Sequence, residues 1–273
     1  MTSVATALAA ARTKLPANEA RLLLGHVLDR PAVWLMAHDD EALDEEAVLR
    51  FASLVARRKG GEPVAYLLGY REFYGRVFAV SPAVLIPRPE TELLVDLALA
   101  QEVGAGGTAK LLDLGTGSGC IAITLALEIP SARVSAVDAS AAALSVARKN
   151  AERLEANLRL LRGDWFDSLA GERFDLIVAN PPYVAEADAH LAAGDLRHEP
   201  RLALAGGDDG LDAIRRIVAD APAHLAPGGR LLLEHGCDQG AAVRDLLESA
   251  GLACVGQHRD LAAIVRVSVG RAA

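Results

Sequence analysis

A short apolar segment that ends in a glycine-rich turn constrains the fold of this chain more than any other feature of its sequence. Leu111, Leu112 and Leu114 predict a buried strand over residues 110–114, and the turn Gly115-Thr116-Gly117-Ser118-Gly119 follows at once. Glycines there let the backbone adopt positive φ angles and approach a ligand closely. A strand, a glycine turn and then a helix predict an α/β sheet with a ligand at the carboxyl end of the strand.

The sequence from residue 90 onward alternates between strand-like and helix-like segments. Such alternation predicts a mostly parallel sheet covered by helices on both faces. The last two strands have no helix between them, so we expect an antiparallel hairpin at the edge. The seven strands are expected at 110–114, 133–137, 158–161, 174–179, 229–235, 252–258 and 263–269, and the helices at 90–102, 119–128, 140–155, 210–224 and 239–249.

The N-terminal residues 1–63 predict a small helical domain of their own. Asp44 precedes an amphipathic segment that ends in Arg57-Arg58-Lys59 and then Gly60-Gly61, which is the pattern of a capped helix with a basic last turn and a glycine stop. A contact surface for an RNA or protein partner is the alternative interpretation of the basic cluster.

Residues 64–89 predict a β-hairpin or extended linker between that domain and the α/β domain at 90–273. Five of the eleven aromatic residues lie here, punctuated by glycines and prolines. They form either a core between the domains or a wall of the active site, and the sequence leaves both open. The five are Tyr66, Tyr70, Phe73, Tyr74 and Phe78.

Charge and cysteine content exclude several classes of protein. The net charge is −8, and residues 90–273 hold 17 Lys and Arg against 26 Asp and Glu. An acidic α/β domain argues against wrapping duplex DNA, where phosphate neutralisation supplies much of the affinity.

The three cysteines, Cys120, Cys237 and Cys254, lack the spacing of a metal site and are expected to be free thiols. We expect Cys120 to be a small packing residue rather than a nucleophile. Without a membrane-spanning run or a signal peptide, we expect a cytoplasmic protein that holds no metal.

Three acidic or aromatic positions follow successive strands and suit S-adenosylmethionine (SAM) better than NAD. Asp138 ends the second strand, where a carboxylate can accept both ribose hydroxyls of an adenosine. Asp164 can accept from the adenine amino group, and the Trp165 indole can pack on the ring. The carboxylate of Asp113, before the first glycine, suits a ligand with an ammonium group better than a pyrophosphate. Each has a plain alternative, since Asp138 could cap the next helix and Trp165 could be core.

The turn Asn180-Pro181-Pro182-Tyr183 follows the fourth strand and carries the predicted chemistry. An amide or aniline-like nitrogen is a poor nucleophile because its lone pair is delocalised. The Asn180 side-chain oxygen and the Pro181 carbonyl can accept from both of its N–H groups, and neither proline donates one. Tyr183 can lie over the flat group. The methyl group of SAM is already activated, so positioning is most of the task.

Taken together, these motifs resemble the peptide-chain release factor glutamine methyltransferase family (HemK/PrmC), over nearly the whole chain. Asn-Pro-Pro-Tyr alone is shared with adenine methyltransferases, but residues 85–92, Leu-Ile-Pro-Arg-Pro-Glu-Thr-Glu, make the resemblance specific. The alanines of Asp260-Leu261-Ala262-Ala263 depart from the family, which usually has glycine there. The other matching segments are 61–69, 72–75, 113–119, 180–183 and 199–204.

The resemblance implies a fold, a reaction and a set of site residues. The fold would be the Rossmann-like SAM-dependent methyltransferase fold, with the N-terminal domain helping to grip the substrate. The product would be N5-methylglutamine in the Gly-Gly-Gln motif of class 1 release factors. SAM would be held by Gly115, Thr116, Gly117, Ser118, Gly119, Asp138, Asp164, Trp165 and Asn180. The substrate would be bound by Asn180, Pro181, Pro182 and Tyr183, and also by Arg88, Thr91 and Glu92.

Two other functions compete with this interpretation. An adenine-N6 methyltransferase would need base flipping and a basic surface, whereas a SAM-binding adaptor without activity would not need an intact Asn180-Pro181-Pro182-Tyr183 turn. We therefore expect an enzyme that is monomeric and binds release factors, with no direct nucleic-acid or membrane partner.

Overall fold

The computed structural model describes residues 2–101 and 108–273, and the chain forms two compact units. The first comprises Met1–Tyr70 with Gly194–His198, and the second comprises Arg71–Ala193 with Glu199–Ala273. Among the described residues no helix is both long and apolar enough to cross a membrane.

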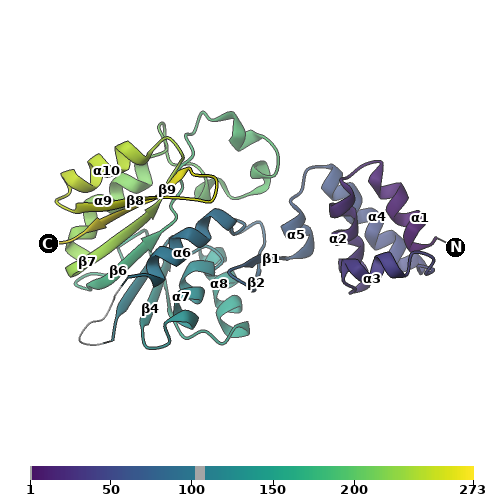
Figure 1. Cartoon of the computed structure of the whole chain (residues 1–273), viewed down its shortest axis with the longest axis horizontal. Helices are drawn as coiled ribbons and strands as arrows, with labels where there is room; N and C mark the ends of the chain where they lie inside the picture. The colour runs from purple at the N-terminus through teal and green to yellow at the C-terminus, as the bar shows by residue number, and fades with distance from the viewer. Residues whose placement is uncertain (1, 102–107) are drawn as a thin grey trace. The chain divides into compact units, whose positions relative to one another are not determined.

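The first unit is a bundle of helices around its own core (Figure 1). Ser3 caps α1, and the Asp44 carboxylate caps α4 by accepting from the Ala47 N–H at 2.7 Å. Gly60 and Gly61 end α4 as predicted. The helices are α1 (Val4–Arg12), α2 (Ala17–Leu28), α3 (Ala32–Ala37), α4 (Glu45–Lys59) and α5 (Val64–Leu68).

The basic turn of α4 is largely occupied by ion pairs inside this unit. Arg58 Nε lies 2.7 Å from Glu19 Oε2, and Arg57 Nε lies 2.8 Å from Glu62 Oε2. Two of the three cations of the Arg57-Arg58-Lys59 cluster are therefore already paired with carboxylates. This favours the structural interpretation of the cluster over a dedicated RNA surface.

The linker forms the predicted hairpin, preceded by a helix that we did not predict. Residues 64–68 are α5 because Pro63 and Gly69 bound a short apolar turn, and β1 (Tyr70–Phe73) and β2 (Arg76–Ala79) follow. Phe73 and Phe78 pack edge to face, with ring centroids 6.1 Å apart, in the core of the second unit. These two rings are core residues of the second unit, which favours the core alternative over the active-site wall for them.

The second unit is the predicted seven-stranded, mostly parallel sheet, in the order β5-β4-β3-β6-β7-β9-β8. Strands β3 to β7 run parallel to one another, and β9 pairs antiparallel with both β7 and β8. The strands are β3 (Lys110–Leu114), β4 (Arg133–Asp138), β5 (Arg159–Arg162), β6 (Phe174–Ala179), β7 (Leu225–Glu234), β8 (Ala253–Arg259) and β9 (Val265–Arg271). The β7 strand begins four residues before the prediction because Leu225 pairs with Phe174 across a register shift.

Helices cover both faces of this sheet (Figure 1). Alternate residues of a strand point to opposite faces: Leu176 and Val178 enter one core, while Ile177 and Ala179 enter the other. The helices are α6 (Glu92–Leu99), α7 (Cys120–Glu128), α8 (Ala141–Arg153), α9 (Asp212–His224) and α10 (Gly240–Ser249), and Pro89–Thr91 forms a 3-10 turn before α6. The end of the predicted helix 90–102 lies outside the described residues.

Candidate active site

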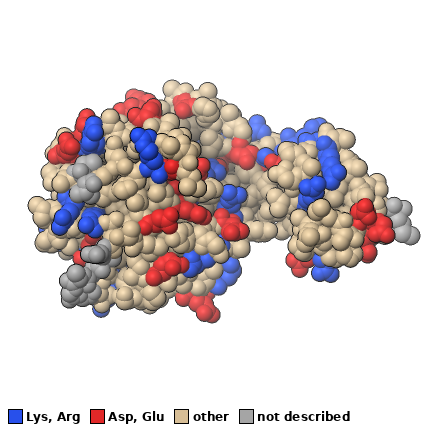
Figure 2. Space-filling view, viewed as in Figure 1, with Lys and Arg blue, Asp and Glu red and all other residues tan. Residues whose placement is uncertain are grey.

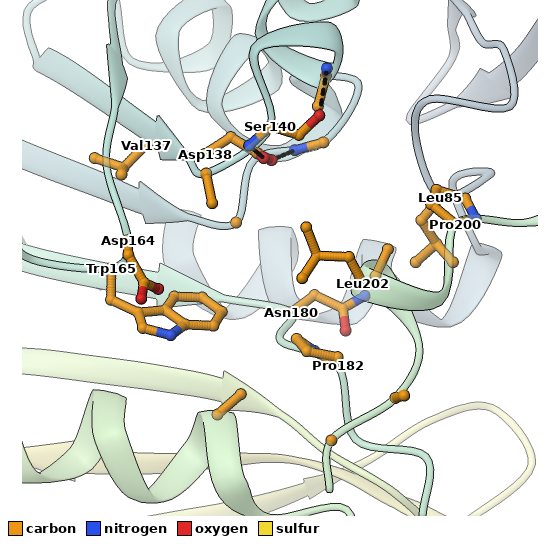
Figure 3. A pocket seen from close by; sticks show the side chains of 18 of the residues that line it. Leu85, Val137, Asp138, Ser140, Asp164, Trp165, Asn180, Pro182, Pro200 and Leu202 are labelled. Atoms are coloured by element: carbon orange, nitrogen blue, oxygen red, sulfur yellow. Dashed lines mark hydrogen bonds between the residues drawn. The ribbon is translucent and has the colours of Figure 1, made fainter. Parts of the chain in front are cut away.

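A cavity of about 520 Å³ opens at the carboxyl ends of β3, β4 and β6. This is the position at which ligands bind in open α/β sheets. Figure 3 shows the side chains of Asp138, Trp165, Asn180 and Leu202 around the same space. Its lining includes Ala83, Val84, Leu85, Gly115, Gly117, Asp138, Ser140, Asp164, Trp165, Asn180, Pro182, Pro200, Leu202, Gly206, Asp212 and Arg216.

The glycine turn adopts the positive φ angles that its sequence predicts. Gly115, Gly117 and Gly119 have φ angles of 72°, 56° and 83°, a region that other residues rarely adopt. A Cβ on Gly115 would lie 3.4 Å from the Trp165 ring and would narrow the cavity. A Cβ on Gly119 would lie 2.8 Å from Ile123 Cδ1, so this third glycine serves the packing of α7. The buried side chains of Thr116 and Ser118 do not line the cavity.

Asp113 is completely buried beneath this turn. Its Oδ2 accepts from Thr116 Oγ1 at 2.6 Å and from the Ala122 N–H at 3.2 Å, so it ties the turn to α7. Its Oδ1 has no hydrogen-bond partner among the described residues. Burial raises the pKa of Asp113 to about 7, against the Thr116 and Ala122 hydrogen bonds, which lower it.

Asp138 holds two backbone N–H groups at the edge of the cavity. Its Oδ2 accepts from Gly117 and its Oδ1 from Ser140, both at 2.8 Å. The cap of α8 is Ser140, whose hydroxyl accepts from Ala143, so Asp138 is not the helix cap that the sequence left open. Burial raises the pKa of Asp138, while the two backbone N–H groups lower it. Each carboxylate oxygen retains a further lone pair for a ligand.

Trp165 and Asp164 line the cavity beyond β5. Trp165 has a positive φ of 52°, an uncommon backbone conformation for a bulky residue. The Asp164 carboxylate pairs with Arg216 of α9, Nη2 to Oδ2 at 2.9 Å. Both partners are about half exposed, so the pair contributes little to stability. Arg216 was not predicted, because α9 follows the motifs at a distance in the sequence.

The Asn180-Pro181-Pro182-Tyr183 turn directly follows β6. Asn180 Nδ2 donates to Thr91 Oγ1 at 3.1 Å, and within the described residues its Oδ1 has no hydrogen-bond partner. Asn180 and Pro182 line the cavity, while Pro181 is buried and Tyr183 lies partly buried behind them. The Tyr183 hydroxyl donates to Glu234 Oε1 at 3.4 Å.

A later loop packs closely against this turn and holds its shape. A Cβ on Gly206 would lie 2.6 Å from the Pro182 carbonyl oxygen, and one on Gly210 would overlap the Tyr183 carbonyl oxygen. Gln239 Nε2 donates to the Tyr183 carbonyl at 3.0 Å. The two carbonyl oxygens are thus packed by glycines, and the turn has little freedom to rearrange.

Arg88, Thr91 and Glu92 do not line the cavity. Arg88 pairs with the buried Glu199 carboxylate, which also accepts from the Ile86 N–H at 2.9 Å. Glu92 Oε1 accepts from the Tyr74 N–H at 2.7 Å. The Thr91 side chain is 2% exposed, and its Oγ1 accepts from Asn180 Nδ2. The predicted substrate contacts of these three residues therefore stay predictions.

Glu234 is a buried carboxyl group that the motifs did not indicate. It ends β7, next to β6, and lies near Thr91 and Tyr183. Its Oε2 has no hydrogen-bond partner among the described residues. Burial raises its pKa to about 7, although the Thr91 hydroxyl and Arg266 lower it. A glutamate that closes an apolar strand, Leu231-Leu232-Leu233-Glu234, is the one signal that sequence analysis could have used.

Cys120 is buried at the start of α7, and burial raises its thiol pKa to about 12. A thiol that stays protonated is a poor nucleophile, which agrees with its predicted packing role.

The geometry fits an adenosine-containing ligand in one part of the cavity and a planar amide in another. Gly115 leaves room beside the Trp165 ring, and Asp138 offers carboxylate lone pairs close by. Asn180 Oδ1 is the free acceptor on the other side. Among the described residues no group of three or more His, Cys, Asp and Glu side chains is arranged to hold a metal ion.

Comparison with known proteins identifies close relatives. The profile of the PrmC N-terminal domain matches residues 1–69, and that of the methyltransferase small domain matches residues 90–197. The release factor glutamine methyltransferase of Bordetella pertussis is 54% identical over 94% of this chain and 95% of that protein. The protein of the same name from Xylella fastidiosa strain Temecula1 is 52% identical over 99% of this chain and 98% of that protein.

Solved structures with lower identity share the fold. A methyltransferase from Pyrococcus furiosus aligns with a TM-score of 0.55 and 19% identity over 81% of this chain and 98% of that one. The 16S rRNA N2 G1207 methyltransferase of Thermus thermophilus, in complex with AdoMet and guanosine, aligns with a TM-score of 0.54 and 24% identity over 75% of this chain and 50% of that one.

Proposed function

Since this chain belongs to the release factor glutamine methyltransferase family, we propose that it transfers a methyl group from SAM to the side-chain amide nitrogen (N5) of a release-factor glutamine. The substrate glutamine is that of the Gly-Gly-Gln motif of class 1 release factors. The observation that carries the proposal is the free Oδ1 of Asn180 at the edge of a cavity that also contains the glycine turn and Asp138.

The residues of the Asn180 turn hold the amide as hydrogen-bond acceptors. Asn180 Oδ1 and the Pro181 carbonyl oxygen each take one N–H of the glutamine, which orients the nitrogen lone pair toward the cofactor side. The prolines supply no competing N–H donor. Pro182 and the Tyr183 ring confine the flat amide, and the packed glycines at 206 and 210 keep the turn from rearranging. Positioning of this kind accounts for most of the expected rate enhancement.

The glycine turn, Asp138, Asp164 and Trp165 are the residues that would hold SAM. Asp138 would accept from the ribose hydroxyls, Trp165 would pack on the adenine ring, and Asp164 would accept from the adenine amino group. When bound, SAM supplies a methyl group on a sulfonium, which is already a strong electrophile.

The helical first unit, Met1–Tyr70 with Gly194–His198, contributes to the recognition of the release factor. We further propose that the protein acts as a cytoplasmic monomer without direct contact to nucleic acid. On the face drawn in Figure 2, Lys and Arg side chains of the larger unit are interspersed with Asp and Glu, and residues 90–273 carry the excess of acidic residues. Such a surface supports a protein partner over a nucleic-acid backbone.

The test is transfer of radiolabelled methyl from SAM to purified, unmethylated release factor. We expect label on the wild-type factor and none on a factor whose Gly-Gly-Gln glutamine is replaced by alanine. Labelling of both factors, or labelling of added DNA or RNA in place of the factor, would contradict the proposal. Weak, salt-sensitive retention on heparin would agree with it, and strong retention would favour the adenine-N6 alternative.

A further inference from the structure

If Asn180 holds the substrate amide, its own side-chain amide must be oriented with Oδ1 toward the substrate. The glutamine nitrogen carries two donors, so only the oxygen of the Asn180 side chain can accept from it. A 180° rotation of that side-chain amide would present Nδ2 instead, and two donors would face each other. The two orientations have nearly the same shape. Packing alone therefore cannot choose between them, and a hydrogen-bond partner is needed.

Thr91 is the partner that contacts the Asn180 amide. Its Oγ1 lies 3.1 Å from Asn180 Nδ2, and the threonine is 2% exposed, so no water competes for this contact. A hydroxyl, however, can either donate or accept. Thr91 selects the Nδ2 orientation only if its own proton is committed elsewhere.

Glu234 is the group that can take that proton. The Thr91 hydroxyl is close enough to the Glu234 carboxyl group to lower its pKa, and the Tyr183 hydroxyl donates to Glu234 Oε1 at 3.4 Å. Leu233 pairs with Ala179 in the parallel sheet, so Glu234 and Asn180 follow paired positions of β7 and β6. Above its raised pKa of about 7 this carboxyl group is ionised and can only accept, and it is 1% exposed with Oε2 free of partners in the described chain.

We infer that Glu234 and Thr91 are positioning residues that fix the orientation of the Asn180 amide, and so present its oxygen to the substrate. Glu234 accepts the Thr91 proton, the Thr91 oxygen accepts from Asn180 Nδ2, and Asn180 Oδ1 remains free for the glutamine N–H. The same carboxylate orients the Tyr183 hydroxyl. This inference rests on the proposed function of Asn180.

The chemistry of substitution at Glu234 gives a sharp expectation. In Glu234→Gln the new NH2 group can donate to Thr91, which frees the Thr91 proton for Asn180 Oδ1 and favours the wrong amide orientation. Thr91→Val keeps the shape of the side chain but removes the hydroxyl, whereas Thr91→Ser keeps the hydroxyl. Thr91→Val and Thr91→Ser are both conservative replacements, and only the serine keeps the hydroxyl that hydrogen bonds to Asn180.

The experiment measures kcat and KM for unmethylated release factor, and the SAM Kd by calorimetry, in these three variants and in Thr91→Val/Glu234→Gln. The matched control is Thr124→Val, because Thr124 is also fully buried and its hydroxyl donates only to the Cys120 carbonyl. We expect kcat to fall about ten- to a hundredfold in Thr91→Val and in Glu234→Gln. Thr91→Ser and Thr124→Val should keep nearly the wild-type kcat, and the SAM Kd should stay nearly constant in all variants.

The double variant tests whether Glu234 acts through Thr91. Residues that act as one unit give losses that do not multiply, so the double variant should be no slower than Thr91→Val. Multiplying losses, a normal kcat in Thr91→Val, or an equal loss in Thr91→Ser would overturn the inference. If Glu234→Gln does not fold, the contrast between Thr91→Val and Thr91→Ser still decides. Failure of the wild-type protein to methylate the factor would count against the proposed function, not against this arrangement.

Discussion

The two sides of the cavity are built in different ways. The glycine side, which we define as Gly115, Gly117 and Asp138, is held mainly by the Asp138 carboxylate, which accepts from the backbone N–H groups of Gly117 and Ser140. The proline side, defined as Asn180 to Tyr183 with Thr91 and Glu234, is held by side chains from three distant segments. A site made from local backbone geometry tolerates changes elsewhere in the chain, whereas a site made from distant side chains depends on each of them.

Each side also has a buried carboxyl group with one oxygen that lacks a partner, Asp113 under the glycine turn and Glu234 behind Asn180. Burial raises the pKa of both to about 7. Asp113 ties the turn to α7, while Glu234 contacts the hydroxyls next to the predicted substrate amide. The two carboxyl groups are thus buried in similar surroundings but have different roles. Asp113 makes a structural contact, whereas by our inference Glu234 orients the Asn180 amide.

The largest expected effect is on the proline side. Asn180→Ala removes the acceptor for the substrate N–H and should lower kcat by roughly a hundred- to a thousandfold or more. The fold should be nearly unchanged, since the turn is held by the glycines at 206 and 210 and by Gln239. The SAM Kd should rise far less than kcat falls, because Asn180 is one of several predicted cofactor contacts. Steady-state kinetics, calorimetry and thermal melting measure these quantities. A folded variant with near-normal turnover would refute the amide-holding role.

On the glycine side, Asp138→Ala should act mainly on cofactor affinity. Loss of a carboxylate that also fixes the Gly117 and Ser140 N–H groups should weaken SAM binding about tenfold or more. At saturating SAM, kcat should recover most of the wild-type value. An unchanged SAM Kd in calorimetry would mean that Asp138 serves only the local backbone, and the contrast between the two sides would fail.

The two buried carboxyl groups should make the fold less stable as pH rises. Between about pH 4 and pH 7 the unfolded chain releases these protons while the folded protein, with pKa values raised to about 7, keeps them. The unfolded state binds fewer protons, so the free energy of unfolding falls through this window. In Asp113→Asn the fall between about pH 5 and pH 8 should be smaller, by on the order of a few kcal/mol.

Urea denaturation at both pH values, compared with wild type, measures this difference. Glu234→Gln should reduce the pH dependence in the same way, but it alone of the two should also lower kcat through Asn180. Identical pH dependence in Asp113→Asn and wild type would show that Asp113 is not protonated in the folded protein near neutral pH.

The smallest expected effect lies outside both sides. Ala263 has a φ of 61° in the turn between β8 and β9. Ala263→Gly should relieve the left-handed strain and raise the free energy of unfolding by about 0.5–1 kcal/mol. Turnover and SAM affinity should stay at wild-type values. Loss of stability in thermal or urea melts would show that the turn is not strained.

The same contrast explains which parts could be predicted from the sequence. The order of strands and helices, the glycine turn and Asp138 follow from local patterns, and the structure places them as predicted, except for α5, the longer β7 and boundaries that differ by a few residues. Arg216 and Glu234 come from segments outside the motifs, and only the apolar strand that ends in Glu234 offers a local signal. Leu202 lies in the matching segment 199–204, but no pattern there indicates that its side chain lines the cavity. Their positions follow from sheet order and loop packing, which sequence spacing does not encode.

Thr91 illustrates the limit most clearly. The segment Leu85 to Glu92 makes the resemblance specific, and the resemblance implies that Arg88, Thr91 and Glu92 all bind the substrate. In the structure, Arg88 pairs with Glu199, Glu92 binds the hairpin, and Thr91 contacts Asn180. Three neighbouring residues thus have three different contacts, because a 3-10 turn points successive side chains in different directions.

The most direct test of the whole account is tandem mass spectrometry of unmethylated release factor after incubation with this protein and SAM. The account predicts the mass gain of one methyl group, located on the side-chain amide of the Gly-Gly-Gln glutamine. A methyl group on another residue, or no gain from an enzyme that binds SAM normally, would contradict it.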